Sequence, residues 1–97
     1  PEVDGETSIQ VATLRLAESG VGMVAVTREG RFIGIVSDKE LMHAYGDAVD
    51  RNSPVIEIAR DTPTIRPYES AAQAVRMLDQ ERFGAIVVVD DDNRPVG

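Results

Sequence analysis

Apolar side chains near the start of the chain recur with the period of an α-helix. Between residues 8 and 19 they fall on one face, which predicts an amphipathic helix after a short extended segment at 2–4. The apolar positions on this face include Ile9, Ala12 and Leu16. Thr7 and Gln10 have the spacing of a capping box, and Gly20 is typical of a helix end.

Two apolar runs separated by a short polar turn follow this helix. They cover residues 23–26 and 32–36, and the sequence Arg-Glu-Gly at 28–30 is typical of a hairpin turn. The second run leads directly into a helix that we predict from Asp38 to Tyr45, ending at Gly46. The first part of the chain is therefore predicted to run strand, helix, strand, turn, strand, helix.

The pattern then repeats with an offset of 62 residues. The positions that coincide are mostly apolar residues and glycines: Pro1 with Pro63, Ser8 with Ser70, Ala12 with Ala74, Leu16 with Leu78, Gly22 with Gly84, and Val26 with Val88. So ordered a set of matches indicates two copies of one structural unit. We therefore divide the chain into a first repeat at 1–46, a connector at 47–62 and a second repeat at 63–97.

The second repeat contains most of the elements of the first. We predict a strand at Thr64–Arg66, a helix from Ser70 to Arg82, and a strand at 85–89 that is buried on both faces. An acidic turn follows at Asp90–Asn93. The sequence given ends at Gly97, where the second counterpart of GIVSDKEL would begin.

Composition narrows the class of protein. An apolar content of 42% in 97 residues is typical of one soluble globular domain. The net charge of −7, with a single lysine, argues against nucleic acid, whose phosphates are bound mainly by Lys and Arg. The absence of cysteine excludes disulfides, zinc thiolates and thiol catalysis. No apolar run suits a membrane span and no leader opens the chain, so we predict a cytoplasmic location without membrane contact.

The order GVGMVAV, hairpin turn, GIVSDKEL, connector and second strand–helix–hairpin resembles a tandem pair of CBS domains, also called a Bateman module. The sequence TIRPYESAAQAVRMLDQERFGAIVVVDDDNRPVG resembles the first part of a second CBS repeat, without its last helix. The resemblance covers the whole chain. It implies an α/β (α+β) fold of tandem β-α-β-β-α repeats, with small mixed sheets packed as a pseudo-two-fold pair. It also implies a homodimer and an attached or separate effector domain.

In this family the junction Gly-apolar-x-Ser/Thr-x-x-Asp/Asn often binds adenosyl compounds, namely AMP, ADP, ATP, S-adenosylmethionine or NAD. Gly34, Ser37 and Glu40 stand at those positions here. The resemblance implies that the hydroxyl contacts phosphate and that the acid accepts from ribose hydroxyls. The unpaired N–H groups of a helix N-terminus favour the same phosphate. Glutamate departs from the pattern by one methylene, about 1.5 Å.

Ser37 and Glu40 are also spaced as a capping box, worth roughly 0.5–2 kcal/mol of helix stability. A cap alone, and a cap that also contacts ligand, both remain open. Met23 and Ala85 stand where the family often has a basic phosphate contact, which argues against tight binding of a di- or triphosphate. The residues expected against the adenine are Val3, Val21 and Met23 in one repeat, and Ile65, Phe83 and Ala85 in the other. Core packing is the alternative for each of them.

Three functions are consistent with this sequence. The first is a regulatory module that senses an adenosyl ligand in the cleft between the repeats. The second is a degenerate CBS pair that serves as a dimerisation or docking element without ligand. The third, suggested only by net acidity, is a divalent-cation sensor that millimolar magnesium would stabilise.

No catalytic or metal site is predicted, so we do not expect an enzyme. His43 is the only histidine, and a lone histidine is more often structural or exposed than catalytic or metal-bound. Asp90, Asp91 and Asp92 lack the spaced ligands of a calcium loop and are typical of an acidic hairpin turn.

Overall fold

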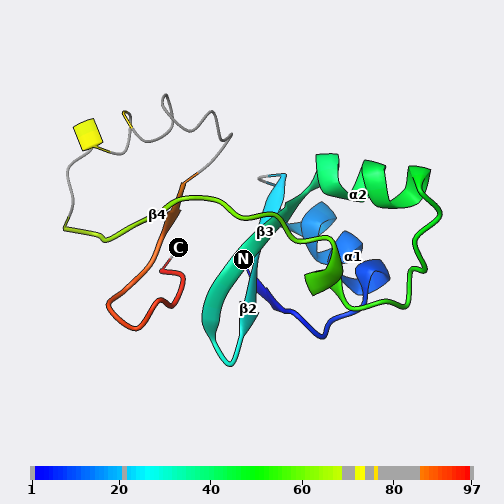
Figure 1. Cartoon of the computed structure of the whole chain (residues 1–97), viewed down its shortest axis with the longest axis horizontal. Helices are drawn as coiled ribbons and strands as arrows, with labels where there is room; N and C mark the ends of the chain where they lie inside the picture. The colour runs from blue at the N-terminus through cyan, green and yellow to red at the C-terminus, as the bar shows by residue number, and fades with distance from the viewer. Residues whose placement is uncertain (1, 21, 69–71, 74–75, 77–85, 97) are drawn as a thin grey trace.

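The computed structural model describes residues 2–20, 22–68, 72–73, 76 and 86–96. Its elements are β1 (Glu2–Asp4), α1 (Ile9–Ser19), β2 (Met23–Arg28), β3 (Arg31–Ser37), α2 (Asp38–Gly46), the 3-10 helix η1 (Val55–Glu57), β4 (Thr64–Ile65) and β5 (Val87–Val88). Figure 1 shows α1 and α2 toward one end of the molecule and β4 toward the other. The mixed α/β class and the β-α-β-β-α order of the first repeat are as predicted. Within the described ranges, no helix is long and apolar enough to cross a membrane.

The first repeat is built on a three-stranded sheet with the order β1-β2-β3. Strand β1 runs parallel to β2 with Val3 opposite Val26, and β2 pairs antiparallel with β3. The turn between β2 and β3 has positive φ at Glu29 and at Gly30, 55° and 80°. This is the conformation of a two-residue type I′ turn, whose twist matches that of the strands. The predicted hairpin is confirmed.

Helix α1 is capped by Ser8, whose Oγ accepts a hydrogen bond from the Val11 N–H at 3.2 Å. The predicted capping box of Thr7 and Gln10 is therefore wrong, because the N-cap lies one residue further along. Gly20 ends the helix with φ 72°, as predicted, since glycine adopts this left-handed conformation without steric cost. Helix α2 extends one residue beyond the predicted Tyr45.

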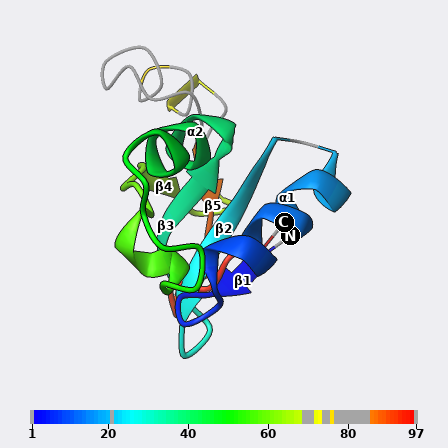
Figure 2. The ribbon, with the colours of Figure 1, turned by 90° about the vertical axis from the view of Figure 1, so that its right-hand side faces the viewer.

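Both helices pack against the same face of the sheet, as Figure 2 lets the reader follow. Alternate residues of β2 face this core, because successive side chains of a strand point to opposite faces. The connector also contributes, through the fully buried Val55 of η1. The buried residues of this helix-side core are Val3, Ile9, Ala12, Leu16, Val24, Val26, Val36, Leu41 and Val55.

The opposite face of β2 and β3 packs against the second repeat. Phe32, Ile35 and Val89 form a buried cluster, and Met23, Ala25 and Val87 pack around it. We call these six residues the inter-repeat core. Strands β4 and β5 pair in parallel, with Thr64 opposite Val87. The side chains of Val87 and Val88 are half-buried, so burial on both faces is not confirmed for this strand. The helix predicted at 70–82 lies largely outside the described residues.

A β-bulge interrupts the regular pairing of β2 with β3. Val26 pairs with Gly34 and Thr27 pairs with Phe32, which leaves Ile33 as the extra residue. The extra residue shifts the alternation of faces by one position. Phe32 and Ile35, three positions apart, therefore both contribute to the inter-repeat core.

Candidate functional site

The predicted Ser-Glu pair lies where β3 passes directly into α2. The backbone N–H of Ser37 donates to Glu40 Oε1 at 2.8 Å, and the Ser37 hydroxyl donates to the same oxygen at 2.6 Å. The two residues form the capping box of α2. Their capping role is confirmed, and contact with a ligand remains a prediction.

The second carboxylate oxygen of Glu40 is held by an arginine of the connector. Arg60 Nε lies 3.2 Å from Glu40 Oε2, with 31% of the arginine side chain and 10% of the glutamate side chain exposed. The sequence reasoning missed Arg60. Nothing in the sequence around Arg60 distinguishes it from Arg51, the other arginine of the connector. The partner of Arg60 is 20 residues away in sequence, and only the fold brings the two together.

The backbone of Arg60 is fixed to the edge of β3. Its N–H donates to the Ile35 carbonyl and its own carbonyl accepts from the Ile35 N–H, both at 2.8 Å. Gly34 makes this approach possible, because a Cβ there would lie 2.9 Å from the Arg60 carbonyl oxygen. Glycine inside a strand often marks such a close backbone approach. Gly34, Ser37, Glu40 and Arg60 therefore form one compact group at the β3–α2 junction.

Hydrogen bonds and charge determine the ionisation of Glu40. Burial by itself raises the pKa of this carboxyl, since it disfavours the charged form. The two hydrogen bonds from Ser37, the charge of Arg60 and the hydrogen bond from Arg60 act in the other direction and together outweigh burial. The net result is a pKa below the ordinary value, so Glu40 is ionised at neutral pH.

Replacing Glu40 by glutamine is expected to reduce the free energy of unfolding by roughly 0.5–2 kcal/mol at neutral pH, the range of a helix cap. The stabilising effect of the ionised carboxylate is present above the ordinary pKa of 4.5 and is lost as the pH falls through the lower pKa of the folded state. Urea denaturation from neutral pH down to about pH 3 should therefore show a stability gap between the two proteins that shrinks only below pH 4.5.

The matched control for this substitution is Glu18→Gln, which removes the same charge at an exposed position of α1. Its stability should differ little from that of the unaltered chain across the pH range. A gap for Glu40→Gln that did not change with pH would contradict the assigned ionisation.

The residues expected to line the adenine do not share one surface. Val3 is 6% exposed and belongs to the helix-side core, whereas Met23 packs in the inter-repeat core. Val3 is in register with Val26, and Val26 and Met23 face opposite sides of β2. Ile65 of β4 is also buried, at 6% exposed. Val21, Phe83 and Ala85 lie outside the described residues.

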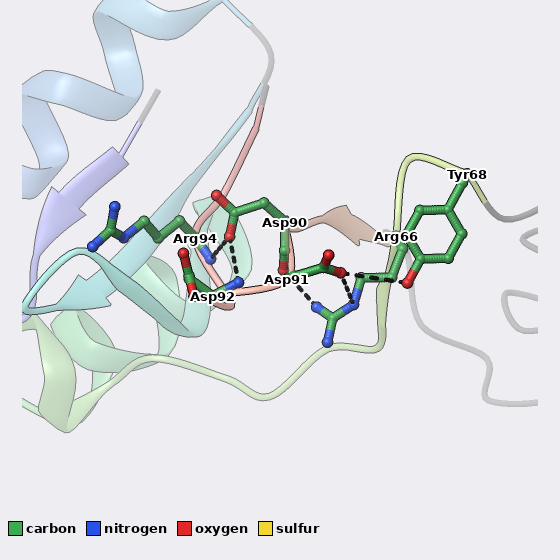
Figure 3. Close-up of polar contacts among 6 residues, drawn as sticks. All are labelled: Arg66, Tyr68, Asp90, Asp91, Asp92 and Arg94. Atoms are coloured by element: carbon green, nitrogen blue, oxygen red, sulfur yellow. Dashed lines mark hydrogen bonds and ion pairs between the residues drawn. The ribbon is translucent and has the colours of Figure 1, made fainter.

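The acidic turn makes its polar contacts with its own backbone and with the start of the second repeat (Figure 3). Asp90 Oδ1 accepts the backbone N–H groups of Asp92 and Arg94, both at 2.9 Å. The hydrogen bond from Arg94 is the main reason that the pKa of Asp90 is lowered. Arg66 Nη1 donates to the Asp90 carbonyl at 2.6 Å, and Arg66 Nε lies 3.6 Å from Asp91 Oδ1. Among the residues that the structure describes, no group of three or more His, Asp or Glu could hold a metal ion.

Comparison with known proteins identifies a curated relative of greater length. Arabinose 5-phosphate isomerase KdsD of Pseudomonas aeruginosa is 34% identical over 100 residues, a match that covers 100% of this chain and 31% of that protein. The chain spans less than a third of the length of the curated relatives it matches.

Solved structures share the fold of the whole chain. A CBS domain protein from Pyrobaculum aerophilum complexed with AMP has a TM-score of 0.87 at 22% identity, covering 100% of this chain and 78% of that one. The structure of CBSX2 in complex with AMP has a TM-score of 0.83 at 24% identity, with the same coverage. The sequence model of the CBS domain matches residues 1–47 and again residues 49–97. Because the two matches span nearly the whole chain, this protein belongs to the CBS domain family and contains a tandem pair of CBS repeats.

Proposed function

We propose that this CBS pair is a regulatory module that senses an adenine nucleotide, or another adenosyl compound, bound between its repeats. The observation that carries the proposal is the group at the β3–α2 junction, where a hydroxyl, a carboxylate and a guanidinium meet within one turn of helix. Two solved CBS structures that share this fold are complexed with AMP, which supports the choice of ligand class. The cytoplasmic location of this protein remains a prediction.

The chemistry of the junction suits a nucleotide. The first turn of α2 offers unpaired N–H groups and a partial positive charge to a phosphate. The Ser37 hydroxyl donates to Glu40 Oε1 at 2.6 Å and so holds the carboxylate in position at the start of α2. Glu40 is ionised, and a carboxylate can accept from ribose hydroxyls. In this proposal the module binds a ligand and catalyses no reaction.

The connector at 47–62 is the route by which we propose that binding is transmitted. Its Arg60 contacts Glu40 directly, and the chain continues from Arg60 into β4 of the second repeat. A ligand at the junction would therefore alter the packing of one repeat on the other. Such regulation requires that the ligand bind two arrangements with different affinity. An attached or separate effector domain would respond to that difference.

Thermal unfolding with added ligand is the test of this proposal. An adenosyl ligand at about 100 times its dissociation constant should add roughly 2.7 kcal/mol to the stability of the chain. For a domain of this size the midpoint should rise by on the order of 10 °C. The panel comprises AMP, ATP, S-adenosylmethionine, NAD and magnesium. Ser37→Ala should reduce the shift relative to its own baseline, whereas Ser19→Ala, at the end of α1, should retain it.

The second candidate function is a dimerisation or docking element without ligand. The observation in its favour is a set of exposed large apolar side chains on α1 and α2, namely Val11, Leu14, Met42 and Tyr45. Flat melting curves across the panel, together with a dimer mass in light scattering, would favour this candidate and contradict the first. A shift with magnesium alone would favour a cation sensor instead.

A further inference from the structure

We infer that Arg60 determines which adenosyl compounds this site accepts, by occupying the carboxylate that a ribose needs and by favouring ligands that carry a phosphate. The favoured class is a nucleoside monophosphate. The inference rests on the proposed function and assigns to Arg60 a role beyond it. Three features of the junction carry the argument: the hydrogen bonds of Glu40, the anchoring of the Arg60 backbone, and the position of its guanidinium.

The hydrogen bonds of Glu40 leave too little capacity for a ribose. A carboxylate has two oxygens with about four acceptor positions between them. Oε1 accepts twice from Ser37, and Oε2 accepts from Arg60. One position remains, whereas the two vicinal hydroxyls of a ribose require two. One of the existing donors must leave before Glu40 can bind both hydroxyls.

Arg60 is the donor best suited to leave. The Ser37 N–H and hydroxyl both belong to the capping box that starts α2, and they donate to Oε1 at 2.8 and 2.6 Å, whereas Arg60 Nε lies 3.2 Å from Oε2. The arginine side chain is long, flexible and 31% exposed, whereas its backbone is held by two hydrogen bonds to Ile35. The guanidinium can therefore move away from Glu40 without displacing the connector.

Moving the guanidinium is favourable only when another anion replaces Glu40. A neutral nucleoside would break the ion pair without bringing a negative charge to replace Glu40. A phosphate offers a pair of acceptor oxygens that match the planar guanidinium. The phosphate of a bound nucleotide is proposed to lie at the start of α2, within one turn of Glu40. Arg60 Nε lies 3.2 Å from Glu40 Oε2, so the guanidinium would need to move only a short way from the carboxylate to the phosphate.

This arrangement places the phosphate-binding cation in the connector. Met23, at the position where the family often has a basic phosphate contact, cannot take this role. It has no charge and packs in the inter-repeat core. A single guanidinium pairs well with one phosphate group, so the ligand that suits it best is a monophosphate. Occupancy of the site would also change the contact between connector and first repeat, at the point where the connector leads into β4.

Isothermal titration of AMP and of adenosine tests the inference. In Arg60→Ala, AMP loses a charged partner while adenosine gains an unblocked carboxylate. The ratio of AMP affinity to adenosine affinity should therefore fall by about tenfold or more. Arg60→Lys keeps a cation but not the planar fork, and should give an intermediate ratio. Arg15→Ala removes the same charge from an exposed position of α1 and should leave the ratio unchanged.

The outcomes separate the inference from the proposed function. Binding of AMP by the unaltered chain with an unchanged ratio in Arg60→Ala would overturn the inference and leave the proposed function intact. An equal fall of the ratio in Arg15→Ala would also overturn it, because net charge would then be the cause. Absence of binding by both proteins with either ligand, and no thermal shift with the remaining adenosyl compounds, would overturn the proposed function and the inference together.

Discussion

Replacing Ile35 by alanine is expected to reduce the free energy of unfolding by about 2–5 kcal/mol and to loosen the second repeat before the first. Ile35 is 1% exposed and packs with Phe32 and Val89 in the inter-repeat core. Truncation removes buried methyl groups and leaves a cavity that the surrounding β-structure can only partly close. In thermal denaturation the midpoint should fall by about 10 °C or more.

Hydrogen exchange identifies which part of the fold is affected by Ile35→Ala. The Val89 amide donates to the Ile65 carbonyl at 2.9 Å, and the Val55 amide donates to the Thr7 carbonyl at 2.7 Å. We expect exchange at Val89 to accelerate more than exchange at Val55, because local openings need not unfold the whole chain. Equal acceleration at both amides would contradict this expectation and indicate that the repeats open as one unit.

The matched control for the stability change is Leu14→Ala. Leu14 is 59% exposed on α1, and its truncation should change stability by no more than about 0.5 kcal/mol. A comparable loss of unfolding free energy in both variants would contradict the prediction. It would mean that the inter-repeat core contributes no more to stability than an exposed position of α1.

The elements of the first repeat could be predicted because their signals are local. The helical period at Ile9, Ala12 and Leu16 is contained within 11 residues of α1. Gly20 and the Glu29–Gly30 turn need positive φ, which short sequence motifs indicate well. The cap was placed one residue early because Thr7 and Ser8 are both suitable N-caps, and the sequence does not choose between them.

The candidate site could be predicted only in part, because half of it depends on long-range contacts. Ser37 and Glu40 are three residues apart, so their pairing at the start of α2 follows from helix geometry. The approach of Arg60 depends on the path of the connector, which has no periodic pattern. The bulge at Ile33 is a further long-range feature, since it is defined by the register between two strands.

The surface expected to bind adenine illustrates the same limit. The resemblance to the family implies that Val3 and Met23 both lie against the adenine. Their faces are determined by the parallel register of Val3 with Val26. Register across a sheet is set by tertiary packing, and a shift of one residue exchanges the two faces. The faces of Val3 and Met23 therefore cannot be predicted until the register of β1 against β2 is known.

The glycine of the junction offers a second test with a large expected effect. Adding a methyl group in Gly34→Ala would place a Cβ 2.9 Å from the Arg60 carbonyl oxygen and 3.3 Å from Ala59 Cβ. The carbonyl cannot retreat without weakening its 2.8 Å hydrogen bond from the Ile35 N–H. We expect a loss toward the upper end of the range for overpacking, about 1–3 kcal/mol.

Gly46→Ala adds the same methyl group at the end of α2 and is the control for Gly34→Ala. Nothing lies within 4 Å of a Cβ at Gly46, and its φ is not positive. Alanine in a helix is favoured over glycine by roughly 0.5–1 kcal/mol, so Gly46→Ala should raise the melting temperature whereas Gly34→Ala should lower it. If the melting temperature moves in opposite directions in the two variants, the contact with the connector is the reason that position 34 requires glycine. The added methyl group meets the connector in Gly34→Ala and meets nothing in Gly46→Ala. An unchanged midpoint in Gly34→Ala would mean that the connector moves aside without cost, and its backbone would then be too loosely held to position Arg60 against Glu40.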